Sequence, residues 1–356
     1  MLGNSETVGM FNTLIKTMNP VSHRQVIDSL LHSSEPSIRW KVLQNCLGES
    51  PDSGRMIRLR EEIRRSPRVK ALLLGHDRLG LPNIYAKWQG AHWILATLSD
   101  IGYPSGDRKL IPLRDRILDA WLAPNFLTEF NAKSKKEVYS KEGVPLMQGR
   151  YRRCASQQGN PLYFLARLGL ENERSKELVE RLLHWQWPDG GWNCDKDPSA
   201  DTSSFMETLL PMLGLHLYAR THRDKAAAKA SERAREVFLR RHLFRRVDNG
   251  KVMHREFVLL HYPLYWHYDI LAGLKAMVLV GAIGDPRCNE ALDLLEQKRL
   301  SDGGWPSESR YYAVEPDRIE LHADYVDWGG TSIRKMNEWV TVDALHVLAS
   351  AGRLRP

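Results

Sequence analysis

The stretch from residue 261 to 269 concentrates side chains that can do chemistry. Its nine residues, HYPLYWHYD, include two histidines, three tyrosines, one tryptophan and one aspartate. A segment of hydrophobic core would use leucine and isoleucine instead, so we expect this stretch to face a ligand. Histidine and carboxylate groups exchange protons with substrates, and aromatic rings stack on them. We therefore predict His261, His267, Tyr268 and Asp269 as acid–base candidates, and Tyr265 and Trp266 as ligand contacts.

Similar polar and aromatic residues open several other apolar segments. The carboxylic acids suited to supply or accept a proton are Asp195, Asp197, Asp201 and Glu207. The residues suited to hold a substrate are Lys87, Trp88, His92, Arg150, Arg152, Arg153, Asn337, Glu338, Trp339 and Asp343. Carboxylates close to several cations would shift one another's pKa values, as acid–base chemistry needs.

Structural roles are open for some of the same residues. Asp201 is also suited to cap a helix, and Glu207, Asp269 and Asp343 are also suited to buried ion pairs between helices. The arginines within residues 150–153 form either a solvated loop or a site for phosphate or carboxylate, which guanidinium groups bind through paired hydrogen bonds.

Two kinds of predicted helix alternate along the chain and must position these residues. One kind is charged and amphipathic, which suits an outer layer, and the other is apolar on most sides, which suits an inner layer. The predicted outer and inner pairs are 22–33 with 36–47, 53–66 with 86–101, 110–122 with 157–169, 172–187 with 202–219, 228–243 with 263–281, and 285–299 with 335–349. Six such antiparallel pairs close into a ring of two concentric layers, an all-α (α/α)6 toroid. We expect one domain over residues 1–356, with a flexible segment at 1–20.

The longest predicted connections all lead from an outer helix into an inner one. They cover residues 67–85, 123–156, 188–201, 244–262 and 300–334. Because they would leave the ring at the same end, we expect them to surround the mouth of a central cavity. The starts of the inner helices, which carry the candidate residues, would then converge on one site.

Two of these connections begin alike. Residues 186–192 read QWPDGGW, and residues 300–305 read LSDGGW. An Asp-Gly-Gly run makes a tight turn that needs a positive φ, and the tryptophan after it can wedge between neighbouring helices. The first copy fits the Q-x-x-x-G-x-W repeat of squalene and oxidosqualene cyclases. Both copies resemble the glycine turn of the wider prenyltransferase and terpene-cyclase superfamily, and this resemblance also implies an (α/α)6 toroid.

The resemblance further implies a terpene cyclase-like or prenyl-substrate enzyme. Such an enzyme folds a polyprenyl chain in an aromatic-lined cavity, stabilises carbocations by cation–π contact and starts the reaction with a carboxylic acid. The candidates for this acid are Asp195, Asp197 and Glu207. The family's D-x-D-D acid motif and its D-D-x-x-D magnesium motif are missing from the sequence, and Ser203 stands where protein prenyltransferases have a zinc-binding cysteine. We therefore expect no metal and no cofactor.

Two other functions remain open. The string Q-x-P-x-G-G-W is also similar to one in α/α-barrel pectate lyases, which act on acidic sugars. The positive charge suits an enzyme for a polar anionic substrate, either a uronate glycan or a glycosidic bond in a nucleotide or nucleic acid. Lys87, Arg150, Arg152 and Arg153 would hold that anion. The third alternative is a toroid that binds a peptide, lipid or nucleic acid without catalysis.

Composition sets broader limits. Hydrophobic residues make up 42% and charged residues 26% of the chain, which excludes a mainly disordered protein. The formal net charge is +8, and residues 225–246 carry eight Lys/Arg against two Asp/Glu. We interpret this basic stretch as a solvated helix face, with nucleic acid as the alternative partner. The four cysteines are scattered, and the sequence has no long apolar run and no leader pattern, so we expect a cytoplasmic protein without a transmembrane segment.

Overall fold

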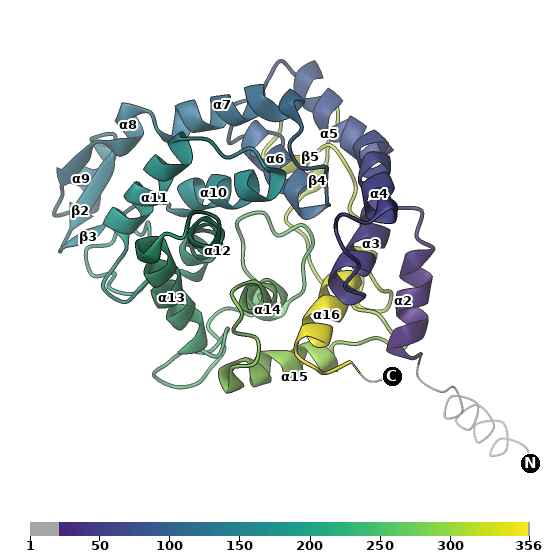
Figure 1. Cartoon of the computed structure of the whole chain (residues 1–356). Coiled ribbons are helices and arrows are strands. Elements are labelled where there is room, and N and C mark those ends of the chain that lie inside the picture. Colours follow the sequence, from purple (N-terminus) through teal and green to yellow (C-terminus); the bar gives the residue numbers. More distant parts are fainter. Residues whose placement is uncertain (1–20, 355–356) are drawn as a thin grey trace, which may run out of the picture.

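The computed structural model describes residues 21–354, and the chain is mostly helical (Figure 1). Its longer helices are α2 (His23–Leu31), α3 (Pro36–Lys41), α4 (Gly54–Arg65), α5 (Pro67–Arg78), α6 (Ala91–Asp100), α7 (Ile111–Trp121), α10 (Ser156–Leu168), α11 (Arg174–Trp185), α12 (Phe205–His222), α13 (Lys225–Leu239), α14 (Ile270–Leu279), α15 (Asn289–Gln297) and α16 (Glu338–Ser350). A π-helical turn (Val42–Cys46) continues α3. The segment at 1–20 that we expect to be flexible lies outside the described residues. Within them, no helix has the length and apolar character needed to cross a membrane.

Apart from α5, which follows α4 directly, the longer helices alternate between an outer and an inner position along the chain. In Figure 1, α2, α4, α7, α11, α13 and α15 lie toward the outside, and α3, α6, α10, α12, α14 and α16 lie nearer the middle. The outer helix α11 buries one stripe that includes Leu178 and Leu182, and it exposes Lys176 and Glu180. The inner helix α12 is buried on most sides, which requires an apolar surface all round. The two kinds of helix expected from the sequence are therefore present.

The inner helix α14 begins at Ile270 and not at 263. The Asp269 carboxylate accepts a hydrogen bond from the backbone N–H of Ala272 at 2.8 Å, and it thereby caps the helix. The segment before this cap is not helical, and Tyr265 has a φ of +53°. The predicted start at 263 is wrong because a side-chain cap replaces the first two turns.

The connection between α4 and α6 contains a helix, α5, that the sequence does not predict. The Ser66 hydroxyl accepts a hydrogen bond from the N–H of Val69 at 3.2 Å, and Pro67 takes the first helical position, so α5 begins here. The predicted start of α6 at 86 is also wrong, since the helix begins after Gly90. A Cβ atom at Gly90 would lie 2.4 Å from the carbonyl oxygen of Ile84, so the turn before α6 requires glycine.

Two connections contain short strands that the sequence does not predict. The connection after α7 holds α8 (Pro124–Leu127), β1 (Glu129–Asn131), α9 (Lys135–Tyr139), β2 (Val144–Met147) and β3 (Arg150–Tyr151). Strand β2 pairs in parallel with β1 and antiparallel with β3. The connection before α16 holds the parallel pair β4 (Ala313–Val314) and β5 (Ala323–Asp324). Strands of two to four residues are too short to give an alternating pattern.

The two Asp-Gly-Gly turns have the same hydrogen bonds. The N–H of Trp187 donates to the carbonyl of Gly191 at 2.8 Å, and the N–H of Leu300 donates to that of Gly304 at 2.9 Å. The first glycine of each Gly-Gly pair has a positive φ, +107° at Gly190 and +88° at Gly303. The sequence repeat is therefore a repeat of backbone structure.

Each turn ends in a tryptophan that joins an outer helix to an inner one. The indole N–H of Trp192 donates to the carbonyl of Leu182 on α11 at 3.0 Å, and its backbone N–H donates to the hydroxyl of Thr208 on α12 at 3.2 Å. Trp305 makes the equivalent bonds, to Leu295 on α15 at 2.7 Å and to Thr341 on α16 at 2.9 Å. Both indoles are buried, so the expected wedge is confirmed.

Candidate functional site

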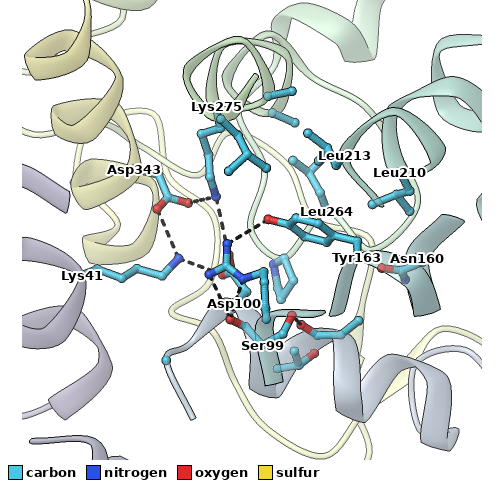
Figure 2. Close-up of a pocket in the computed structure, with 18 of the residues that line it drawn as sticks. Lys41, Ser99, Asp100, Asn160, Tyr163, Leu210, Leu213, Leu264, Lys275 and Asp343 are labelled. Carbon is cyan, nitrogen blue, oxygen red and sulfur yellow. Dashed lines mark hydrogen bonds and ion pairs between the residues drawn. The ribbon is translucent and has the colours of Figure 1, made fainter. Parts of the chain in front are cut away.

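A cavity of about 680 Å³ lies among the inner helices. Pockets of this size hold ordinary small-molecule ligands. Most of its lining comes from α3, α6, α10, α12, α14 and α16, mainly from their middle and C-terminal turns, and from the segment before α14. Figure 2 shows charged groups on one side and Leu210, Leu213 and Leu264 on the other. The cavity is therefore amphipathic.

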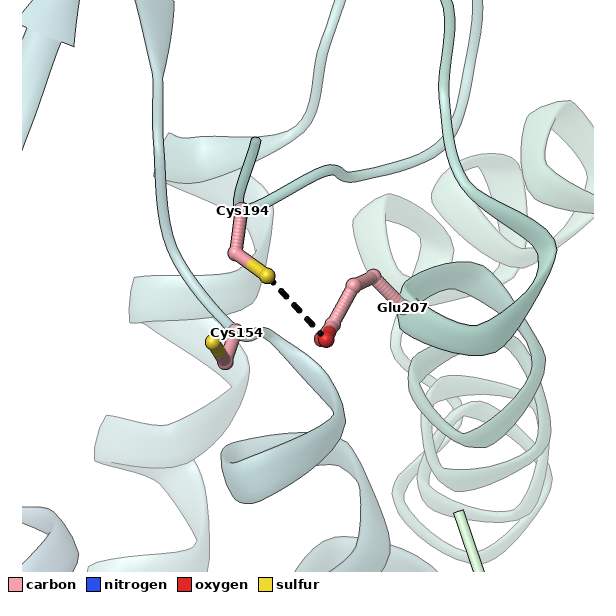
Figure 3. A group of neighbouring side chains, drawn as sticks. All are labelled: Cys154, Cys194 and Glu207. Atoms are coloured by element: carbon pink, nitrogen blue, oxygen red, sulfur yellow. Dashed lines mark hydrogen bonds between the residues drawn. The ribbon is translucent and has the colours of Figure 1, made fainter. Parts of the chain in front are cut away.

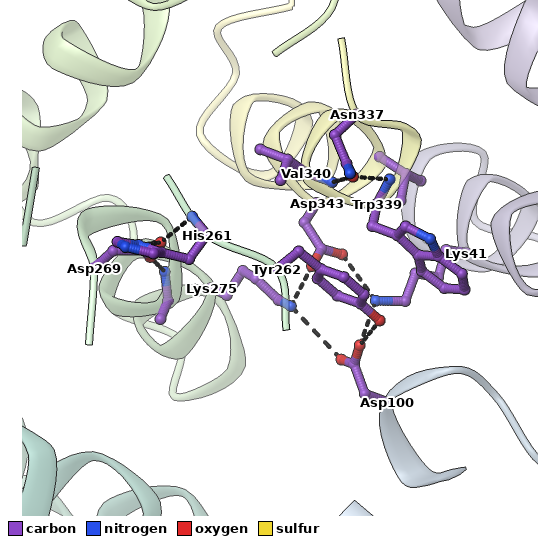
Figure 4. Close-up of polar contacts among 12 residues, drawn as sticks. Lys41, Asp100, His261, Tyr262, Asp269, Lys275, Asn337, Trp339, Val340 and Asp343 are labelled. Atoms are coloured by element: carbon purple, nitrogen blue, oxygen red, sulfur yellow. Dashed lines mark hydrogen bonds and ion pairs between the residues drawn. The ribbon is translucent and has the colours of Figure 1, made fainter. Parts of the chain in front are cut away.

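The charged side is built from four residues, which we call the cavity ion network: Lys41, Asp100, Lys275 and Asp343 (Figure 4). The ammonium group of Lys41 lies 2.8 Å from Asp100 and 3.2 Å from Asp343. Lys275 pairs with Asp343 and lies 3.7 Å from Asp100. Lys41 and Asp343 are almost fully buried, whereas Lys275 and Asp100 are partly exposed to the cavity.

Further polar groups extend the network along the cavity wall. The Tyr262 hydroxyl donates to Asp100 at 2.8 Å. The Arg167 guanidinium donates to the hydroxyl of Tyr163 at 2.9 Å and to the carbonyl of Ser99 at 3.1 Å. With Arg167 included, three cations face two carboxylates here, and Arg60 and Arg220 also line the cavity. The excess of positive charge favours an anionic ligand.

The Asp100 carboxylate in the cavity is not poised as a proton donor. Burial raises the pKa of Asp100, but the neighbouring charges of Lys41 and Lys275 outweigh burial and hold it well below its usual range. Burial lowers the pKa of Lys275, and Asp343 and Asp100 reverse this effect and raise it above the ordinary value. Asp100 and Lys275 are therefore both charged across the physiological range.

The segment before α14 closes one side of the cavity. His261, Tyr265 and His267 line it. The sequence predicts Tyr265 as a ligand contact and the two histidines as acid–base candidates. The Tyr265 ring stacks on Trp88 at a centroid distance of 3.8 Å, and the His267 ring stacks on Tyr311 at 3.5 Å. The stack on Trp88 fixes the segment against the connection before α6, and the stack on Tyr311 fixes it against the connection before α16.

Other predicted residues of this segment have structural partners. The Tyr268 hydroxyl donates to the carbonyl of Leu243 at 2.7 Å, and Asp269 accepts the N–H of His261 at 2.9 Å while capping α14. Lys87 lies over the Trp266 ring at 5.1 Å, and neither residue lines the cavity. The acid–base candidates therefore divide into two histidines at the cavity and two buried structural groups.

The three predicted arginines lie outside the cavity lining. Arg152 is buried and donates to the carbonyls of Ala200 at 2.7 Å and Pro198 at 3.4 Å. Arg153 is buried over the Phe126 ring, and Arg150 lies over the Trp187 ring. The guanidinium of Arg152 is thus bound to main-chain carbonyls, and those of Arg150 and Arg153 pack on aromatic rings.

The remaining predicted residues are spread over several places. Asp195 and Asp201 are exposed, and Asp197 pairs with Lys135 at 3.2 Å. Helix α12 begins after Ser204, so Asp201 does not cap it. Asn337 caps α16, Glu338 accepts a hydrogen bond from Ser33 at 2.9 Å, and Trp339 stacks on Tyr262. Of the residues that we predict on α16, Asp343 reaches the cavity.

His92 lies in a buried aromatic cluster outside the cavity lining. The indole N–H of Trp121 donates to its Nδ1 at 3.1 Å, and the Asn160 amide lies 3.0 Å from its Nε2. Burial lowers the pKa of His92 to about 3, and it lowers the pKa values of His267 and His346 to about 4. These histidines are neutral in the folded chain at neutral pH.

Stability is expected to fall between pH 7 and pH 5. In the unfolded chain these histidines take up protons near pH 6.5, whereas the folded chain holds them neutral, so acid favours unfolding by about 1–2 kcal/mol per histidine. Burial lowers the pKa of His261, but Asp269 and Glu256 outweigh burial and raise it above 6.5. His261 therefore acts in the opposite sense: it stabilises the folded chain at acidic pH, and this stabilisation is lost as the pH rises above 6.5. Urea unfolding at the two pH values measures the difference, and His92→Gln should reduce it. Equal stability at both values would contradict the assignment.

A second cluster of reactive groups lies outside the cavity lining (Figure 3). The thiols of Cys154 and Cys194 and the carboxylate of Glu207 have ligand atoms within 4.8 Å of one another. The Cys194 thiol donates to Glu207 at 3.4 Å. Burial raises the pKa of Glu207, although Ser156 and Cys194 hydrogen-bond to it. These are the residue types that bind a divalent transition metal.

Sequence reasoning misses Lys41, Asp100, Arg167 and Lys275. The sequence feature that could have identified them is a single charged residue in an apolar helix. Examples are Lys275 in ILAGLKAMVL and Asp100 at the end of AHWILATLSD. A buried charge is costly unless it is paired, so such a charge indicates a partner on a facing helix.

No known protein-family model matches the chain, and no curated protein matches it in sequence.

Proposed function

We propose that the described helices form an (α/α)6 toroid. Two observations support this architecture. Apart from α5, the longer outer and inner helices alternate along the chain, and most of the cavity lining comes from the six inner ones and the segment before α14. The tryptophan bridges after the two Asp-Gly-Gly turns repeat the same link between an outer and an inner helix.

We infer that the cavity binds a prenyl-type substrate with an anionic head group, such as a prenyl diphosphate. The observation that carries this inference is the pairing of a cationic wall with a leucine wall in one cavity. The ammonium groups of Lys41 and Lys275 and the guanidinium of Arg167 suit a phosphate or carboxylate. Leu210, Leu213 and their neighbours suit a hydrocarbon chain.

The same arrangement favours one kind of chemistry. Cations at the head group would stabilise negative charge that develops as a carbon–oxygen bond breaks. The rings of Tyr163, Tyr262 and Tyr265 line the cavity and could stabilise a carbocation through their faces. An acid-initiated cyclisation is supported less, because the lysines keep Asp100 ionised.

A polar anionic substrate, such as a uronate or a nucleotide, has weaker support. The arginines suited to hold it donate to main-chain carbonyls or pack on aromatic rings. The leucine wall would remain in contact with a polar ligand, which gains nothing from apolar burial.

Lys275→Met is expected to weaken binding of farnesyl diphosphate by at least about tenfold, because it removes one charge-assisted contact to the head group. Isothermal titration of the wild type and the variant measures this loss. Lys229→Met, which removes an exposed lysine on α13, is the matched control and should bind like the wild type. Farnesol should bind more weakly than the diphosphate.

Two outcomes would overturn the proposal. One is equal binding by wild type and Lys275→Met. The other is binding of galacturonate oligomers or nucleotides while all prenyl compounds fail to bind. If farnesyl diphosphate binds, incubation followed by mass spectrometry of the extracted prenyl compounds tests for turnover.

A further inference from the structure

Three separate segments bring Cys154, Cys194 and Glu207 together. Cys154 lies between β3 and α10, Cys194 follows the first Asp-Gly-Gly turn, and Glu207 is in the first turn of α12. Figure 3 shows the Cys194 and Glu207 side chains pointing toward each other, with Cys154 beside them. The cluster thus depends on the tertiary fold and not on a local sequence motif.

The distances fit a small tetrahedral ion after slight contraction. Sulfur and oxygen ligands of a tetrahedral Zn²⁺ lie about 3.5–3.8 Å apart, because each is about 2.0–2.3 Å from the ion. The Cys194 sulfur and the Glu207 Oε1 atom are 3.4 Å apart, and the ligand atoms of all three residues lie within 4.8 Å of one another. Only side-chain rotations are then needed to close the set around an ion.

The carboxylate of Glu207 is held in place from the other side. Its Oε2 atom accepts the backbone N–H of Ser156, the first residue of α10, at 3.0 Å. This bond leaves Oε1 directed at Cys194. Hydrogen bonds of this kind orient the ligands of metal sites and are part of their affinity.

A buried cation balances the charge of the cluster. Two thiolates and one carboxylate around Zn²⁺ leave one net negative charge. Arg153 is next to Cys154 in sequence and only 8% exposed. Its Nη2 atom is buried and has no hydrogen-bond partner within residues 21–354. A buried guanidinium needs a compensating negative charge, which a metal-bound cluster would supply.

We propose that Cys154, Cys194 and Glu207 form a Zn²⁺ site. Zinc takes thiolate and carboxylate ligands, and mixed soft and hard sets of this kind exclude Mg²⁺ and Ca²⁺, which prefer oxygen alone. Three protein ligands leave a fourth position for water or a substrate atom. The site lies outside the cavity lining, so the zinc proposal does not depend on whether the cavity binds a prenyl ligand.

The test uses the full chain, purified under reducing conditions and stripped of metal with a chelator. Titration with Zn²⁺ should give about one tightly bound ion per chain, and titration with Co²⁺ should give thiolate charge-transfer absorption and the visible bands of a tetrahedral site. Cys154→Ser, Cys194→Ser and Glu207→Gln should each weaken Zn²⁺ binding by at least about tenfold. Cys46→Ser is the matched control, because Cys46 is a partly buried cysteine in another part of the fold.

Glu207→Gln keeps the shape of the side chain and guards against misfolding of the cysteine variants. Circular dichroism should show its helix content unchanged, and added Zn²⁺ should raise the melting temperature of the wild type more than that of the variant. The proposal is overturned if the wild type binds no Zn²⁺, or if the three variants bind it like Cys46→Ser. It is also overturned if the two cysteines instead form a disulfide that persists under the reducing conditions.

Discussion

Asp343→Asn is expected to lower the free energy of unfolding by about 3–5 kcal/mol, because it removes one of the two carboxylates that two lysines share. Lys41 is almost fully buried, and its ammonium group lies 3.2 Å from Asp343. Lys275 also pairs with Asp343. Without the carboxylate, Asp100 alone would compensate two ammonium groups in a poorly solvated region. Urea unfolding followed by circular dichroism measures the change.

The control for this prediction is an exposed aspartate in an ion pair. Asp293 pairs with Arg353 and keeps about half of its side chain exposed, so Asp293→Asn should cost at most about 1 kcal/mol. A cost for Asp343→Asn as small as the control's would contradict the role given to the cavity ion network.

A double variant separates unpaired charge from lost packing. In Lys41→Met with Asp343→Asn, Lys275 and Asp100 remain as one balanced pair 3.7 Å apart. The double variant should therefore be more stable than Asp343→Asn alone, because it no longer holds a buried lysine without sufficient negative charge. Additive losses from the two substitutions would show that the energy lies in packing and not in charge.

Helix type could be predicted from the sequence more reliably than helix boundaries. Apolar and amphipathic helices differ over a dozen residues, and the pattern distinguishes α12 from α11. The starts of α6 and α14 depend on single contacts, a close approach at Gly90 and the cap by Asp269. Neither contact changes the hydrophobic pattern, so the pattern extends both helices too far.

The candidate site could be predicted only in part, because histidine, tyrosine, arginine and carboxylate side chains also serve structural roles in the folded chain. His261, Tyr265, His267 and Asp343 line the cavity, as expected. The predicted site lies at the starts of the inner helices, but the charged wall uses Asp100 and Arg167 near the ends of theirs.

The cysteine cluster illustrates contacts that sequence spacing hides. Cys154 and Cys194 are 40 residues apart and belong to no short motif. They meet because the connection before α10 and the connection after the first Asp-Gly-Gly turn approach each other, as the parallel bridge between Arg152 and Asn193 records. Only knowledge of how the connections pair would have placed them together.

Trp305→Ala is expected to lower the free energy of unfolding by about 3–5 kcal/mol, as large aromatic truncations in a core do. The Trp305 ring is fully buried, and its N–H bonds to the carbonyl of Leu295 at 2.7 Å. The substitution opens a cavity between α15 and α16 and leaves that carbonyl without its partner. Trp305→Phe retains most of the ring and loses the hydrogen bond, so it should cost less. Chemical unfolding of both variants gives the comparison, and similar small losses would mean that the tryptophan does not hold the two helices together.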